Sequence, residues 1–229
     1  MSGMAARRGR RRGPGHRAGI TAEAVVQAAR DVYSSDGISG LTMRAVARTL
    51  DVAANALYSH VQSKMDLVEA LIDSLLTEIG SPPADLDWRE GLVWLMSESR
   101  SILLRYSDLM PLFLSRPARG PNARRLGETT LGLLALGGVE GAAAVTALRV
   151  LLVYTFGFAA QEAPRLLEPD DAARKAASRR AFGASEKHPR MRSLAGDLAE
   201  HPGKVVFETG LRWIIRGIES AQSARRPSH

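Results

Sequence analysis

The fold is decided by residues 40–64, which have the sequence GLTMRAVARTLDVAANALYSHVQSK. Thr42 is a typical N-cap for a helix that would bury Val46 on its inner face. Asp51 then interrupts the apolar pattern, and a second short helix is expected after it. The apolar residues of that helix recur every four residues, at Ala53, Leu57 and Val61. The stretch therefore predicts two helices joined by a tight turn.

The rest of the chain also has helical periodicity, without strand-like alternation, so we expect an all-α protein. A supporting helix should run from Thr21 to a C-cap at Gly37, and a longer helix should start after an N-cap at Ser63. This longer helix should end at Gly80, where two prolines follow. Further helices are expected at 87–107, 109–115, 121–136, 140–163 and 204–221. The polar segment 168–202 has weak periodicity, and we expect it to be the most flexible region.

Charge is distributed unevenly along the chain. Of the 229 residues, 31 are Lys or Arg and 24 are Asp or Glu, and none is cysteine. Residues 1–64 contain ten Lys or Arg against four Asp or Glu, so nearly all the excess positive charge lies in the first quarter. This asymmetry indicates a polyanionic partner for the N-terminal end. The lack of cysteine excludes disulfides, thiolate nucleophiles and cysteine-based metal sites.

Two helices and a short turn inside a basic region form the outline of a helix-turn-helix motif. With Leu57 packed inward, Asn55, Tyr58 and His60 should face outward. Alanines at the start of the second helix would let its backbone sit deep in a DNA major groove, which is about 12 Å wide. We therefore expect double-stranded DNA as a partner.

These residues resemble the TetR family of bacterial repressors. The run Leu-Tyr-x-His-Val-x-x-Lys at 57–64 is quite specific, particularly to the tetracycline-repressor-like branch, and weaker similarity continues at 108–117 and 154–158. The resemblance implies an Ω-shaped, all-α homodimer. Each subunit would have an N-terminal three-helix DNA-binding domain and a C-terminal helical domain for ligand binding and dimerisation. The implied function is that of a sequence-specific transcriptional repressor, released from its operator by a small-molecule inducer.

The expected organisation has three parts: a disordered basic arm at 1–17, the DNA-binding domain at 18–79 and the ligand-binding and dimerisation domain at 84–225. The family's DNA contacts correspond here to Thr42, Met43, Arg44, Ala53, Ala54, Asn55, Ala56, Tyr58, Ser59, His60 and Lys64. Among them, Asn55 could bind an adenine edge, while Tyr58, His60 and Lys64 match phosphate contacts. Met43 replaces a threonine that touches phosphate and cannot do the same.

Two departures from the tetracycline repressor bear on the ligand. Leu112 stands where that repressor has a metal-binding histidine, and Gln161 where it has a glutamate that orders the water around the metal. Magnesium–tetracycline is therefore not the expected inducer, and we expect an apolar or aromatic molecule bound without metal or cofactor. The candidate ligand-binding residues are Trp94, Leu112, Phe113, Arg116, Tyr154, Phe158 and Gln161.

Other interpretations stay open at this point. The chain could be a helical ligand-binding or scaffold protein whose helix-turn-helix no longer binds DNA, or an activator of the same fold. The sequence has no nucleophile elbow and no pair of carboxylates on one predicted face, so we do not expect an enzyme. The apolar segment 142–160 contains Arg149, which is costly in a bilayer, so we expect a core or dimer-interface helix in a cytoplasmic protein rather than a membrane span.

Overall fold

The computed structural model describes residues 20–115, 119–166, 171–184, 186–200 and 203–223, and in these ranges the structure is helical without strands. The predicted all-α class is confirmed. The described residues form two compact units, one up to Leu67 and one from Val68 onward. The predicted arm at 1–17 and the candidate ligand residue Arg116 lie outside the described residues. The predicted domain limits at 79 and 84 remain predictions.

The first helix of the N-terminal unit is α1 (Ala22–Gly40), and it begins as expected with Thr21 as its N-cap. The Thr21 hydroxyl accepts a hydrogen bond from the backbone N–H of Ala24 at 3.1 Å. At Gly37 the backbone leaves helical geometry, with φ of 65° and ψ of −169°. Only glycine adopts this conformation readily, which explains why the helix breaks at Gly37, one turn before its last residue.

The two helices of the predicted motif are α2 (Met43–Thr49) and η1 (Ala54–Ser59). The Thr42 hydroxyl accepts from the Ala45 N–H at 3.1 Å, so Thr42 is the N-cap, as expected. The second element is a 3₁₀-helix of six residues, with Leu57 buried and Ala53 exposed. The expected four-residue repeat beginning at Ala53 is therefore wrong, because a 3₁₀-helix has three residues per turn and places Ala54 beside Leu57.

The connecting helix is α3 (Lys64–Leu75), followed by the 3₁₀ turn η2 (Leu76–Glu78). Ser63 caps it as predicted, since the Ser63 hydroxyl accepts from the Asp66 N–H at 3.1 Å and the Asp66 carboxylate accepts from the Gln62 N–H at 3.0 Å. These two bonds form a reciprocal capping arrangement. The division between the two units falls within this helix.

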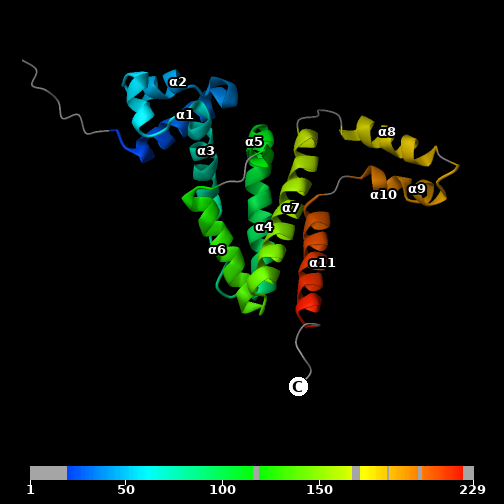
Figure 1. The fold of residues 1–229 in the computed structure, drawn as a ribbon. Helices are drawn as coiled ribbons and strands as arrows, with labels where there is room; N and C mark the ends of the chain where they lie inside the picture. The colour runs from blue at the N-terminus through cyan, green and yellow to red at the C-terminus, as the bar shows by residue number, and fades with distance from the viewer. Residues whose placement is uncertain (1–19, 116–118, 167–170, 185, 201–202, 224–229) are drawn as a thin grey trace, which may run out of the picture. The chain divides into compact units, whose positions relative to one another are not determined.

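The C-terminal unit contains a bundle of four long helices, α4 (Trp88–Arg105), α6 (Pro121–Leu136), α7 (Gly141–Leu166) and α11 (Lys204–Ser223). They lie side by side in Figure 1, and α4 contacts each of the other three. A 3₁₀ turn, η3 (Ser107–Leu109), and the short helix α5 (Met110–Ser115) connect α4 to the segment before α6. Leu92, Leu95, Leu151, Phe207 and Leu211 are fully buried and form part of the core.

The segment 168–202 has more regular structure in its described residues, 171–184 and 186–200, than its weak periodicity indicated, and its flexibility remains a prediction. It contains α8 (Asp171–Gly183), α9 (Pro189–Ser193) and α10 (Ala195–Ala199), which pack on one another. Its buried side chains are small, among them Ala195 and Ala199. Alanine contributes little contrast to a hydrophobicity pattern, so periodicity alone did not predict these helices.

One helix of the described residues, Gly141–Pro164, is long and apolar enough to cross a membrane by the criteria of length and composition. It belongs to α7, and it packs against α4, α6 and α11. Ala144, Ala147, Leu151 and Ala159 face these helices and are buried. One face of this apolar helix therefore has protein neighbours within the subunit.

Candidate DNA interface and ligand site

The outward face of η1 has the register that the sequence predicted. Leu57 and Val61 are buried, and Tyr58 between them is 55% exposed. Asn55, Ser59 and His60 are also exposed. With Leu57 buried in η1 and Val61 buried just after it, η1 and its C-cap His60 expose an amide, a phenol, a hydroxyl and an imidazole.

The other predicted DNA contacts lie around this face in two groups. Arg44, Ala53 and Lys64 are exposed, whereas Met43, Ala54 and Ala56 are half-buried. Thr42 is exposed, but its hydroxyl already serves as the N-cap of α2. Capping leaves the second lone pair of this oxygen and its hydrogen available, so a DNA contact from Thr42 remains a prediction.

The start of α1 adds an acidic group near the predicted interface. The pKa of Glu23 is lowered, first by the hydrogen bond from its own backbone N–H, then by the Thr21 hydroxyl, and to a smaller extent by the charge of His60. Glu23 is therefore ionised at neutral pH and adds a negative charge beside His60. The imidazole therefore interacts electrostatically with the start of α1.

The described part of the N-terminal unit is close to neutral. Residues 20–67 contain four Lys or Arg and five Asp or Glu. The excess positive charge of this unit therefore belongs to residues 1–17, where six arginines occur. Attraction to DNA phosphates, which depends on cationic side chains, would come mainly from this arm.

Aromatic side chains contact two different faces of α7. Tyr154 and Phe158 contact each other and Phe207 of α11, with ring centroids 5.1–5.7 Å apart. Phe156 contacts Phe113 of α5 instead, at 6.3 Å. Residues two apart on a helix point in nearly opposite directions, so these contacts form two separate clusters.

The first cluster also contains a buried ion pair that the sequence analysis missed. Arg100 of α4 donates from Nε to Glu162 Oε2 at 2.9 Å and from Nη2 to Oε1 at 2.5 Å. Its guanidinium carbon lies 5.9 Å from the Phe158 ring and 5.4 Å from the Phe207 ring. The signal in the sequence was a charged residue within an apolar helical face, four residues after the buried Met96.

Tyr154 fastens this cluster to α11. Its phenol donates a hydrogen bond to the backbone carbonyl of Phe207 at 3.0 Å, and a side chain at Gly210 would overlap the phenolic oxygen. Burial raises the pKa of Tyr154, and the charge of Arg100 offsets part of this increase. The phenol is therefore neutral at physiological pH and acts as a donor.

The remaining predicted ligand residues do not join this cluster. Gln161 is exposed and Leu112 is half-buried. The half-buried Trp94 lies against the backbone at Gly80. Among the described members of the predicted set, the structure brings Tyr154 and Phe158 together, and no ring contact joins Trp94, Leu112, Phe113 or Gln161 to them.

The Arg100–Glu162 pair gives a stability prediction. Arg100→Met leaves the Glu162 carboxylate, which is only 14% exposed, without its cation. We expect a loss of about 3 kcal/mol in the free energy of unfolding, near the lower limit for a broken buried pair because Glu162 keeps some contact with water. Urea unfolding of the variant measures this loss. The double variant Arg100→Met/Glu162→Gln should recover about half of it, and strictly additive losses would contradict the pairing.

Several large apolar side chains are exposed on α7 and α11. Val145, Leu152 and Val153 of α7 and Val206 and Trp213 of α11 are all exposed, and we call these five residues the α7–α11 apolar face. Val153 is 73% and Trp213 68% exposed. Large apolar side chains so exposed on two packed helices indicate an interface with another protein surface.

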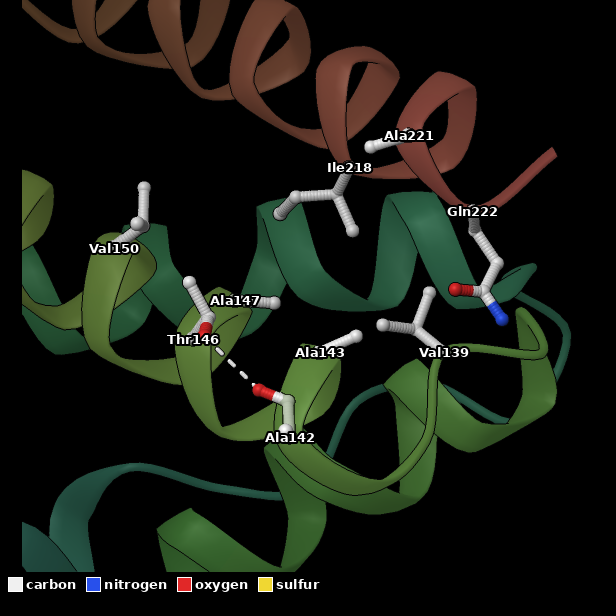
Figure 2. Close-up of a pocket in the computed structure, with 9 residues that line it drawn as sticks. All are labelled: Val139, Ala142, Ala143, Thr146, Ala147, Val150, Ile218, Ala221 and Gln222. Carbon is white, nitrogen blue, oxygen red and sulfur yellow. Dashed lines mark hydrogen bonds between the residues drawn. The ribbon is translucent and has the colours of Figure 1, made fainter. Parts of the chain in front are cut away.

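A groove of about 250 Å³ lies between the N-terminal part of α7 and the C-terminal part of α11. Figure 2 shows Ile218 of α11 pointing toward Ala143 and Ala147 of α7. The Gln222 amide closes one end by donating to the Gly138 carbonyl at 2.6 Å. The groove is lined by small apolar side chains and has no charged group among them, so it suits helix packing better than recognition of a polar ligand.

Comparison with known proteins identifies relatives over nearly the whole chain. The family described as "Bacterial regulatory proteins, tetR family" matches residues 25–71, and "Tetracyclin repressor-like, C-terminal domain" matches residues 81–222. The HTH-type transcriptional repressor DrrR1 of Streptomyces coeruleorubidus is 31% identical over 95% of this chain and 84% of its own length. A class A tetracycline repressor from Escherichia coli is 30% identical over 85% and 88%.

Solved structures of TetR family proteins have a similar fold. The complex of ActR from Streptomyces coelicolor with actinorhodin superposes with a TM-score of 0.77, at 25% identity, and the match covers 89% of this chain and 98% of ActR. The similarity includes both the helix-turn-helix and the C-terminal helical bundle.

Proposed function

Since the chain belongs to the TetR family of bacterial regulatory proteins, we propose that it is a homodimeric repressor that a small molecule releases from a specific operator. Relatives that cover most of the chain are transcriptional repressors. The observation on which the proposal rests is the outer face of η1, where Asn55 and Tyr58 are exposed above the buried Leu57.

In the proposed complex, η1 enters the major groove and the residues around it contact phosphates. Asn55 is the only amide at the start of η1, and it binds a base edge. Tyr58, His60 and Lys64 bind phosphates and fix the register of the protein on DNA. The six arginines of residues 1–17 lie along the adjacent minor groove.

Two substitutions on η1 test this assignment. Tyr58→Ala should weaken binding to operator and to random DNA by the same factor, because a phosphate contact contains no sequence information. Asn55→Ala should instead lower the ratio between the two affinities by about tenfold, the value of one good base contact. Fluorescence anisotropy with both duplexes measures the two effects. The reverse pattern would show that the base-facing and phosphate-facing roles are misassigned, and a wild-type chain without operator preference would favour a scaffold protein.

For the inducer, we propose an apolar or aromatic molecule that binds in the C-terminal domain near Tyr154 and Phe158. A structural relative, ActR, has been crystallised with actinorhodin, which supports a small-molecule ligand. The aromatic rings beside Arg100 supply apolar contacts with few directing polar groups, as ligand pockets usually do. Such a molecule acts only if it binds the DNA-incompetent state more tightly than the DNA-bound state.

Metal-free induction has a direct test. Neither Leu112 nor Gln161 provides the imidazole or carboxylate that a magnesium-bound ligand would use. Within a panel of aromatic polyketides, any compound that releases the operator should therefore do so equally in EDTA and in added Mg²⁺. Release that requires Mg²⁺ would contradict this part of the proposal. Anisotropy of a labelled operator duplex provides the measurement.

For the quaternary structure, we propose that the α7–α11 apolar face pairs with the same face of a second copy. TetR-family proteins act as dimers, and two-fold symmetry matches an operator with two half-sites. The proposal also accounts for the long apolar helix α7, whose exposed face would be covered by protein and not by lipid. TetR-family regulators are soluble and non-enzymatic, and we place this one in the cytoplasm without a catalytic role.

A further inference from the structure

The end of α3 is fastened to the start of α6 by a buried carboxylate. Asp73 of α3 is 7% exposed. Its carboxylate accepts hydrogen bonds from the backbone N–H groups of Asn122 at 3.1 Å and Ala123 at 3.0 Å, and from the Asn122 side-chain amide at 3.0 Å. Asp73 therefore caps a helix that begins almost fifty residues later in the chain.

A second side chain makes the reverse connection. Arg125 of α6 donates from Nη2 to the backbone carbonyls of Leu76 at 3.0 Å and Ile79 at 2.9 Å. These carbonyls lie just beyond the C-terminal end of α3, where helical carbonyls lack partners within the helix. A carboxylate at the positive end of α6 and a guanidinium at the negative end of α3 also complement the two helix dipoles.

The cap of α6 differs from those of α1, α2 and α4. Thr21, Thr42 and Asp87 cap the helices that directly follow them, whereas the N-cap of α6 is Gly120, which has no side chain. A Cβ atom at Gly120 would overlap the Asp73 carboxylate. Ser or Asp at position 120 could cap α6 locally. With glycine there, the cap comes from Asp73, and this contact joins α3 to α6.

We propose that Asp73 is a positioning residue that transmits a conformational change of the C-terminal domain to the DNA-binding unit. This inference rests on the proposed function. Helix α3 starts at Lys64, a predicted phosphate contact, and ends in the second unit, where Asp73 and Arg125 hold it to α6. Because a buried carboxylate cannot lose three donors cheaply, α3 follows any movement of the start of α6. Operator binding and ligand binding then change the same contact between α3 and α6. Each binding event therefore alters the affinity for the other ligand by the same factor.

The test compares hydrogen exchange of the Asn122 and Ala123 amides with and without an operator duplex selected by the full chain. Two variants break the contact in different ways. Asp73→Asn turns an amide donor toward the N–H groups of α6, and Gly120→Ala displaces the carboxylate. Two matched controls leave it intact: Gly127→Ala on α6, where a Cβ meets nothing within 4 Å, and Asp87→Asn, which makes the same change of carboxylate to amide at the ordinary cap of α4.

In the wild type and in both controls, operator binding should slow exchange at Asn122 and Ala123 by at least about threefold, because DNA holds α3 in one position. In Asp73→Asn and Gly120→Ala this dependence on operator should disappear, and operator affinity should fall about tenfold, while circular dichroism still reports a folded chain. If the cap had a purely structural role, the Asn122 and Ala123 amides would exchange at the same rate with and without operator.

Two results would overturn the inference: a wild-type chain that binds operator without any change at these amides, or a change that persists in both Asp73→Asn and Gly120→Ala. Either result would leave the proposed function intact. Failure to select any DNA sequence would contradict the proposed function itself, and the inference with it.

Discussion

Val153→Arg should convert the protein to a monomer and reduce its operator affinity at least about 100-fold, since the second half-site is then bound as an independent event. Val153 is the most exposed residue of the α7–α11 apolar face, at 73%, so arginine should fit the isolated subunit without strain. In a symmetric dimer, two arginines would be buried in an apolar interface without partners. Sedimentation velocity measures the mass, and anisotropy measures the affinity.

The control for this variant is Leu136→Arg. Leu136 of α6 is 77% exposed and lies outside the α7–α11 apolar face, so this variant should remain dimeric with unchanged affinity. A dimeric Val153→Arg would place the subunit interface elsewhere. If Trp213→Arg also remained dimeric, the proposed face would be wrong on both helices.

Deletion of residues 1–17 should lower affinity for every DNA sequence and flatten its dependence on salt. The arm contains six arginines, and each phosphate contact adds about −0.9 to the slope of log K against log salt, so the slope should become less negative by up to about 5. Residues 20–67 of the same unit, with four basic and five acidic residues, cannot replace this charge. Anisotropy titrations over a series of salt concentrations measure the slope.

The matched control keeps the arm at full length and changes its six arginines to glutamine. It should behave as the deletion does, because charge and not chain length determines counterion release. An unchanged slope in the deletion variant would show that the arm stays in solvent. A change in the deletion but not in the glutamine variant would assign the effect to the arm's backbone.

Local chemistry made much of the fold predictable. A helix start depends on a hydroxyl or carboxylate within three residues of the N–H groups that it caps, so Thr42 and Ser63 marked two helix starts from sequence alone. The inward register of Leu57 and the exposure of Tyr58 followed from the same local pattern. The resemblance to TetR repressors then supplied the function, and comparison confirmed the family.

Features formed between distant parts of the chain were not predictable. Arg100 and Glu162 are 62 residues apart, and the contact of Asp73 with α6 spans 50 residues at its longest. No local pattern reveals such partners. The 3₁₀ geometry of η1 was also missed, because six residues are too few to distinguish a period of 3 from one of 3.6. The sequence also did not show which aromatic residues meet. Phe113 contacts Phe156, whereas Tyr154 contacts Phe158 and Phe207, because these residues lie on different sides of α7.

The central claim is that this chain binds a specific DNA sequence as a repressor does. Its most direct test is the affinity of the full-length protein for a duplex selected from a random library, compared with its affinity for an unselected duplex of equal length at one salt concentration. We expect a selected site with two symmetric half-sites, bound at least about 1,000-fold more tightly than the unselected duplex. Equal affinity for the two duplexes would show that the protein does not recognise a specific sequence.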